Sequence, residues 1–97
     1  MLTIRKATEA DAEAIVRSWA EMMAVQAQFD SFFEMNPDAA QIYAGFTGQN
    51  IGKPGTLVLV ADLDGGVVGY ALAECADYPP VYPRTRYAHI IEVGVTP

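Results

Sequence analysis

The first third of the chain changes from strand periodicity to helix periodicity. Residues 2–7 alternate between apolar and polar side chains, which is typical of a strand with one buried face. At Thr8 the period changes, and apolar residues then recur at helical spacing along 15–29. Thr8 and Asp11 resemble a capping box, with Asp in place of the usual Glu. We therefore predict a short strand followed by a helix over about 9–28.

A second, shorter helix is predicted from its start signal. Asn36 is a preferred N-cap residue, and Pro37 suits the first helical position because its missing N–H would be unpaired there anyway. We expect this helix to fray at Gly45 or Gly48. The Gly- and Pro-rich stretch 51–55 cannot continue it and is predicted to be a loop.

The rest of the chain has the composition of strands. A hairpin is predicted, with its first strand over 57–61, a turn at 64–66 and a return strand over 67–74. Three prolines predict a stiff loop over 77–87, and 88–95 forms the last strand. The predicted order is βααβββ. This is an α+β fold with two helices and a mostly antiparallel four-stranded sheet, in one domain.

Composition and charge narrow the class of protein. The 97 residues are 52% hydrophobic, so either the core is unusually efficient or part of the apolar surface is meant for a partner. A net charge of −6 argues against a nucleic-acid surface. No apolar run is long enough to span a membrane, and the start lacks the features of a signal peptide. With a single cysteine as well, we expect a cytoplasmic protein.

Three stretches resemble the first half of the GCN5-related N-acetyltransferase (GNAT) superfamily. The first strand carries an Ile-Arg-x-Ala pattern at 4–7, and the returning hairpin strand reads Gly-Val-Val-Gly-Tyr at 66–70. The last strand ends in Val-x-Pro after an acidic residue, at 92–97. The stretches occur in the family's order and spacing over the whole chain.

The resemblance implies acetyl transfer from acetyl-CoA to the amine of a small molecule. In the family, an Arg/Gln-x-x-Gly-x-Gly/Ala loop follows the proline and holds the pyrophosphate of acetyl-CoA. This sequence stops at Pro97, before that loop. We therefore expect a truncated GNAT-like domain, 1–97, that is weak or inactive alone; a fragment, a cleaved product and a shortened reading frame all fit. The alternative is a non-catalytic assembly module whose exposed last strand pairs with a second copy or with a missing C-terminal half.

The resemblance assigns roles to the last strand. Val93, Gly94 and Val95 would pair their backbone with the pantetheine arm, and Gly94 would allow close approach. The alternative is a plain buried strand with a Gly bulge. Glu92 is the candidate base that deprotonates the amine, directly or through water. It could instead lie on a solvated face or pair with Arg84 or Arg86.

His89 is a second candidate base, because the ordinary pKa of histidine lies near neutrality. A structural role is the alternative. On an alternating strand His89 shares a face with Ile91 and Val93, whereas Glu92 points the other way, so the two are not expected to form a dyad. With one histidine and one cysteine, no metal site is predicted.

By resemblance, the acceptor side is formed by both helices and the loop before the last strand. Glu34 or Asp77 could attract a cationic amine there. Core packing is the alternative role for most of the aromatic residues in these segments. The candidate pocket walls are Phe29, Phe32, Phe33, Tyr43, Tyr78, Tyr82 and Tyr87.

Overall fold

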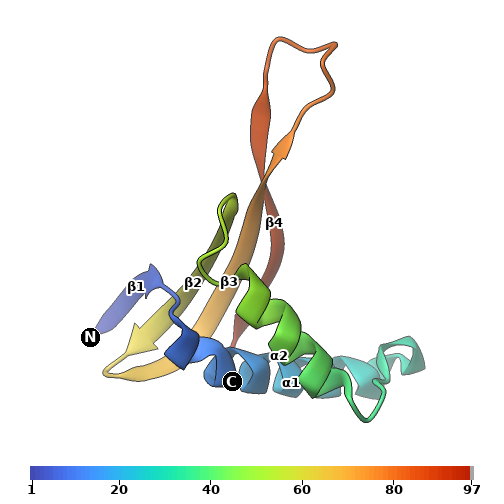
Figure 1. The fold of residues 1–97 in the computed structure, drawn as a ribbon. Coiled ribbons are helices and arrows are strands. Elements are labelled where there is room, and N and C mark those ends of the chain that lie inside the picture. Colours follow the sequence, from blue (N-terminus) through green and yellow to red (C-terminus); the bar gives the residue numbers. More distant parts are fainter. Residues whose placement is uncertain (97) are drawn as a thin grey trace.

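The computed structural model describes residues 1–96 and shows a four-stranded sheet with two helices packed on one face (Figure 1). This confirms the predicted α+β class and the βααβββ order. Pro97, the last residue of the Val-x-Pro pattern, lies outside the described residues. In chain order the elements are β1 (Leu2–Lys6), α1 (Ala12–Phe29), α2 (Ala39–Asn50), β2 (Thr56–Leu63), β3 (Gly66–Asp77) and β4 (Arg86–Val95).

The sheet is antiparallel throughout, with its strands in chain order, β1-β2-β3-β4. Strand β4 pairs only with β3, so its outer edge has no strand partner among residues 1–96. The ends of β3 and β4 extend well beyond the other strands as a long arm (Figure 1). The register shifts once between β2 and β3, after Ala61, and once between β3 and β4, at Leu72 and Ala73.

The core lies between α1 and the middle of the sheet. Ile15 of α1 is 1% exposed and packs against Val58 and Val60 of β2 and Tyr70 and Leu72 of β3. These positions alternate along each strand, so their side chains all point to the helix-covered face. Burying apolar side chains of this size contributes about 1.5–3 kcal/mol each. The core therefore fixes which face of β3 and β4 looks toward the helices.

The opposite face of the sheet is apolar and exposed. Ile4 pairs with Ala61, and Val93 pairs with Ala71, all on the side away from the buried Tyr70. Ile4 and Val93 are 61% and 59% exposed. An uncovered apolar sheet face is a common feature of surfaces that meet another protein segment.

An ion-pair cluster joins β1, β2 and the start of α1. Arg5 binds the buried Asp11 at 2.8 Å and Asp62 at 3.1 Å. Asp11 also accepts the Thr8 backbone N–H at 2.8 Å, as the predicted capping box requires. Chiefly through its hydrogen bonds with Arg5, Asp11 has its pKa lowered to about 2.

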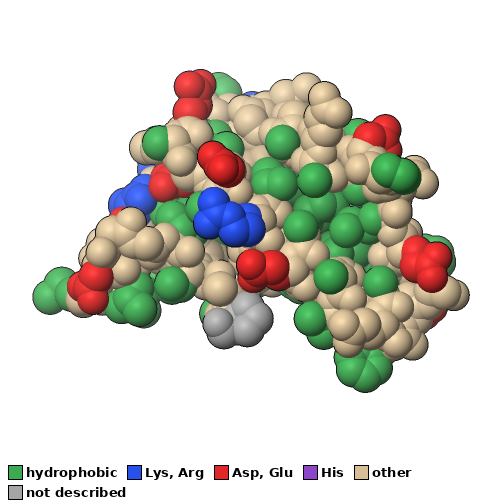
Figure 2. Space-filling model, turned by 90° about the horizontal axis from the view of Figure 1, so that it is seen from below, with side chains coloured by type: hydrophobic (Ala, Val, Ile, Leu, Met, Phe, Trp, Pro, Cys, Tyr) green, Lys and Arg blue, Asp and Glu red, His purple; other side chains and the backbone are tan. Residues whose placement is uncertain are grey.

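Elsewhere the charge is mostly acidic. The chain carries 12 Asp and Glu against 6 Lys and Arg. Figure 2, which shows the molecule from below, has acidic side chains at several points around a hollow that is lined with hydrophobic side chains.

Helix α2 starts later and ends later than predicted. A turn, in which the Ala39 N–H donates to the Asn36 carbonyl at 3.0 Å, replaces the expected first helical residues, and Asp38 is the N-cap. The helix does not fray at its glycines, because its last turn is anchored. Asn50 is buried and donates to the Phe46 carbonyl at 2.8 Å, while the Thr56 hydroxyl donates to the Asn50 carbonyl at 2.8 Å.

The β3–β4 hairpin is longer than predicted, because pairing continues into the proline-rich stretch. Ala76 pairs with Tyr87, and Asp77 pairs with Arg86. The side chains of Asp77 and Arg86 also form an ion pair at 3.4 Å. The prolines follow Asp77 at the tip, where their missing N–H groups disturb no ladder.

Candidate functional site

A carboxylate on β4 accepts hydrogen bonds from two phenols that come from different elements. Glu92 lies opposite the buried Leu72 and therefore faces the helices. The Tyr70 hydroxyl of β3 donates to Glu92 Oε1 at 2.6 Å, and the Tyr43 hydroxyl of α2 donates to the same oxygen. The chain thus brings α2, β3 and β4 together at one carboxylate.

The two tyrosines act as fixed donors. Burial and the neighbouring Glu92 raise the pKa of both Tyr43 and Tyr70 well above the ordinary value, so both phenols keep their protons at neutral pH. Both phenols bond to Oε1, and within residues 1–96 the other carboxylate oxygen, Glu92 Oε2, accepts no hydrogen bond. The phenols therefore orient Glu92 and leave one oxygen to accept a proton or a hydrogen bond from a small molecule or water.

Within the described residues, the partners of the Glu92 carboxylate are two phenols and not an arginine. Glu92 is half-buried and bonded to tyrosines, which differs from a solvated face. Arg86 forms its ion pair with Asp77 instead. The role of Glu92 as a base stays a prediction.

His89 lies on the same face as Glu92, so the predicted opposite orientation is wrong. Glu92 pairs with Leu72 and His89 pairs with Glu74, and Leu72 and Glu74 point to one face of β3. A bulge at Ile91 adds one residue to β4 and reverses the alternation between the two. The two still have separate partners: His89 Nδ1 lies 3.2 Å from Glu74 Oε1, in an exposed pair.

The absence of a side chain at Gly94 serves the tyrosine donor. Tyr70 pairs with Gly94 across the strands, and its ring fills the space where a larger residue would place its Cβ. On the helix-covered face of the sheet, the Tyr70 ring therefore occupies the space beside Gly94. A ligand that pairs with the backbone of Val93, Gly94 and Val95 would have to approach along the outer edge of β4.

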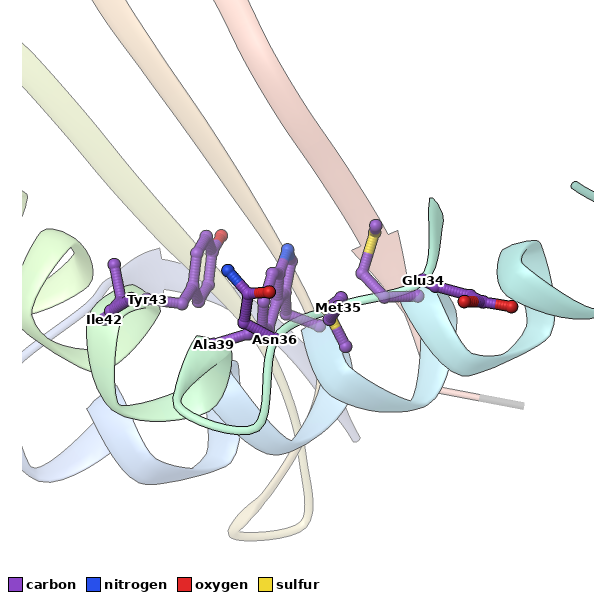
Figure 3. A pocket seen from close by; sticks show the side chains of 8 residues that line it. Glu34, Met35, Asn36, Ala39, Ile42 and Tyr43 are labelled. Atoms are coloured by element: carbon purple, nitrogen blue, oxygen red, sulfur yellow. The ribbon is translucent and has the colours of Figure 1, made fainter. Parts of the chain in front are cut away.

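A pocket of about 340 Å³ lies between α1, α2 and the segment that connects them (Figure 3). Tyr43 belongs both to this pocket and to the Glu92 cluster. Its ring stacks on Trp19 of α1, with centroids 4.0 Å apart and planes within 6°. Figure 3 shows Ile42 and Tyr43 at one end of the lining and Glu34 at the other. The lining residues are Trp19, Met23, Glu34, Met35, Asn36, Ala39, Ile42 and Tyr43.

The predicted aromatic walls are distributed over three places. Tyr43 lines the pocket between the helices, whereas Phe29 and Phe32 are more than four-fifths exposed on the surface. Phe33 packs edge-on against Phe32, with ring centroids 5.4 Å apart. On the arm, Tyr78 contacts two other tyrosine rings, at centroid distances of 4.7 and 6.3 Å, beside a second cavity of about 280 Å³. Those two rings belong to Tyr82 and Tyr87.

Sequence reasoning missed Tyr70, Trp19 and Met23 as site residues. Tyr70 was visible only as part of the Gly-Val-Val-Gly-Tyr pattern. Tyr70 and Leu72 alternate on one face of the strand, which predicts that Tyr70 is buried. A buried phenol needs a hydrogen-bond partner, and this requirement could have indicated a role for Tyr70 in the site. Trp19 contacts the core but also forms a wall of the pocket. Nothing in helical spacing distinguishes those two roles.

In residues 1–96, no group of three or more potential metal ligands lies together. None of the helices there is long and apolar enough to cross a membrane.

No protein-family model and no curated protein matches the sequence, but solved structures match the fold. A mutant of the BH1408 protein from Bacillus halodurans is 18% identical, with a TM-score of 0.81, over 96% of this chain and 60% of its own. A predicted acetyltransferase with acetyl-CoA from Clostridium acetobutylicum is 19% identical, with a TM-score of 0.68, over 100% and 61%. An aminoglycoside antibiotic 6'-N-acetyltransferase from Acinetobacter baumannii is 16% identical, with a TM-score of 0.62, over 100% and 58%.

This chain spans about three fifths of the length of these structures. At such identities the likeness concerns the fold. The sequence-based expectation is confirmed at that level: the chain shares its fold with part of solved acetyltransferase structures.

Proposed function

We propose that the chain is the amine-binding and base-bearing part of an N-acetyltransferase that moves an acetyl group from acetyl-CoA to a small-molecule amine. The observation that carries the proposal is the position of Glu92. It is a half-buried carboxylate on the open edge strand, oriented by two phenols, one of which lines a pocket. The acetyltransferase fold of the chain supports the same activity.

In this proposal Glu92 removes the proton from the amine. An ammonium nitrogen has no lone pair for attack, so a base must take a proton before or during acetyl transfer. The free oxygen of Glu92 accepts that proton directly or through one water. Tyr43 and Tyr70 hold the other oxygen and so fix the direction of the free one.

The pantetheine arm of acetyl-CoA fits the outer edge of β4. That arm is a linear chain with amide groups, and an open strand edge offers alternating N–H and C=O groups to such a chain. Val93, Gly94 and Val95 lie on this edge, on the same strand as Glu92. When bound, acetyl-CoA supplies the activated acetyl group.

The 97 residues contain no Arg/Gln-x-x-Gly-x-Gly/Ala stretch. We therefore expect them to hold the diphosphate of acetyl-CoA poorly and to transfer acetyl groups slowly when tested alone. The Acinetobacter baumannii neighbour is named for an aminoglycoside substrate. The apolar pocket of this chain suits an amine with an aliphatic body better than a polyhydroxylated one, because hydroxyls buried without partners are costly.

The test combines calorimetric titration with acetyl-CoA and an acetyl-transfer assay on small aliphatic amines. We expect weak binding and slow transfer, and we expect Glu92→Gln to lower the rate at least about 100-fold while acetyl-CoA binding persists. Glu74→Gln is the matched control, since Glu74 is an exposed carboxylate that pairs with His89. Equal rates for the Glu92→Gln variant and the wild type would contradict the proposal, as would a complete lack of acetyl-CoA binding.

A second candidate is a non-catalytic assembly module. It is favoured by the unpaired edge of β4 and by the exposed apolar sheet face that this edge borders. In that case the last strand would pair with a second copy or with a separate C-terminal half.

A further inference from the structure

One carboxylate lines the pocket between α1 and α2 at one end, and a second carboxylate is hydrogen-bonded to a lining residue at the other end. At one end stands Tyr43, whose hydroxyl donates to Glu92. At the other end stands Glu34, which comes from the segment that connects the helices (Figure 3). The two carboxylates come from parts of the chain 58 residues apart. Glu34 lines the cavity itself, whereas Glu92 is connected to it through the hydrogen bond with Tyr43.

The surface between these ends is apolar and adaptable. Met23 of α1, Met35 of the connection and Ile42 of α2 provide aliphatic side chains along the cavity. Methionine is unbranched and flexible, so two of them can close around a linear hydrocarbon chain. The ring of Trp19 completes the wall and suits either a methylene chain or a cation on its face.

We propose that this pocket binds an amine whose reacting nitrogen is joined by a short aliphatic spacer to a second cationic group, as in a linear diamine. The inference rests on the proposed function for the direction of binding, with the reacting nitrogen at the Tyr43 end beside Glu92. The spacer lies against the methionines, and the second cation pairs with Glu34. A monoamine would leave Glu34 without a charged partner, and a polyhydroxylated amine would place hydroxyls against the methionines.

The size of the cavity agrees with this class of ligand. About 340 Å³ is at the lower end of the range for small-molecule sites, which run from about 300 to 1,000 Å³. The net charge of −6 also favours the approach of a dication over that of a monocation.

Trp19 is the only tryptophan of the chain and lines the pocket, so its fluorescence reports binding without acetyl-CoA. The probes are cadaverine and pentylamine, which share a five-carbon chain and differ in the second amine. We expect cadaverine to bind about three- to fivefold more tightly, the gain of one ion pair with an exposed carboxylate. In Glu34→Gln that ratio should fall to about one or two.

Asp38→Asn is the matched control, because it removes the same charge from the same connection but does not line the pocket. It should leave the cadaverine preference unchanged. Equal binding of the two probes by the wild type would overturn the inference, and so would an equal loss of preference in both variants.

This titration and the acetyl-transfer assay together separate the two proposals. Preference for cadaverine that depends on Glu34, without any acetyl transfer, would support the ligand class and count against the acetyltransferase function. Acetyl transfer without a preference for cadaverine would support the acetyltransferase function and count against the ligand class.

Discussion

The ring of Tyr70 lies over Gly94, in the space that a side chain at position 94 would need. The two residues are partners across β3 and β4, and a Cβ atom built on Gly94 would lie 2.9 Å from Cζ of the Tyr70 ring. Tyr70 is 4% exposed and directs its hydroxyl to Glu92, two residues from Gly94 along β4. The glycine therefore allows the position of the donor that orients the candidate base.

Gly94→Ala should destabilise the chain and displace Tyr70 from Glu92. Inserting a methyl group into a packed site costs about 1–3 kcal/mol, because the ring or the strand must shift. Urea unfolding would measure the loss. Gly48→Ala is the matched control: it lies in α2 with nothing within 4 Å of the added atom, and it should stabilise the helix by up to about 1 kcal/mol. If the urea midpoint of Gly94→Ala equals that of the wild type, the contact between Tyr70 and Gly94 does not constrain the site.

Removing the Tyr43 hydroxyl should weaken the junction of α2 with the sheet. Tyr43→Phe keeps the stack on Trp19 but removes one of the two donors to Glu92. A hydrogen bond to a charged, partly buried acceptor is worth about 1–2 kcal/mol, so the free energy of unfolding should fall by about that amount. Tyr82→Phe removes a phenol that is 58% exposed and should change nothing measurable. Equal unfolding midpoints for the two variants would argue against the bond.

Stability should fall in acid because of Asp11. Its pKa is lowered in the folded state to about 2, so the folded state binds this proton less readily than the unfolded state does. The stabilisation is fully present above the unfolded pKa, near pH 4, and is lost as the pH falls toward 2. A shift of this size corresponds to about 2 kcal/mol. Urea unfolding at pH 6 and pH 3 should show a smaller difference for Asp11→Asn than for the wild type. An identical pH dependence in both would show that other carboxylates carry the effect.

The order of elements followed from local signals that do not depend on distant contacts. Alternation around Ile4, helical spacing after Thr8 and the Asp-Gly-Gly turn each depend on residues close in sequence. The helix ends were less predictable. Asn50 extends α2 because its side chain and carbonyl find partners, one of them beyond the helix at Thr56, and propensity does not contain such contacts.

The candidate site was predicted only in part for a related reason. Glu92 was found through the family resemblance, which assigns the base to a carboxylate of the last strand. Its orientation relative to His89 was wrong, because one bulged residue, Ile91, reverses the alternation and leaves no signal in the local pattern. Tyr70 became a donor to Glu92 only through the pairing of β3 with β4.

The edge of β4 should support self-association if the assembly-module function is correct. Val93 and Val95 are 59% and 73% exposed on this strand, and neither carries the charge that usually protects a free edge. Sedimentation analysis should then show a concentration-dependent dimer. Val93→Lys should weaken it at least about tenfold, because a lysine ammonium resists burial between paired strands or apolar faces. Val25→Lys on α1, at a position 49% exposed, should leave it intact. A wild-type chain that stays monomeric at high concentration would exclude pairing with a second copy and leave the edge to a separate C-terminal half or to a ligand such as the pantetheine arm.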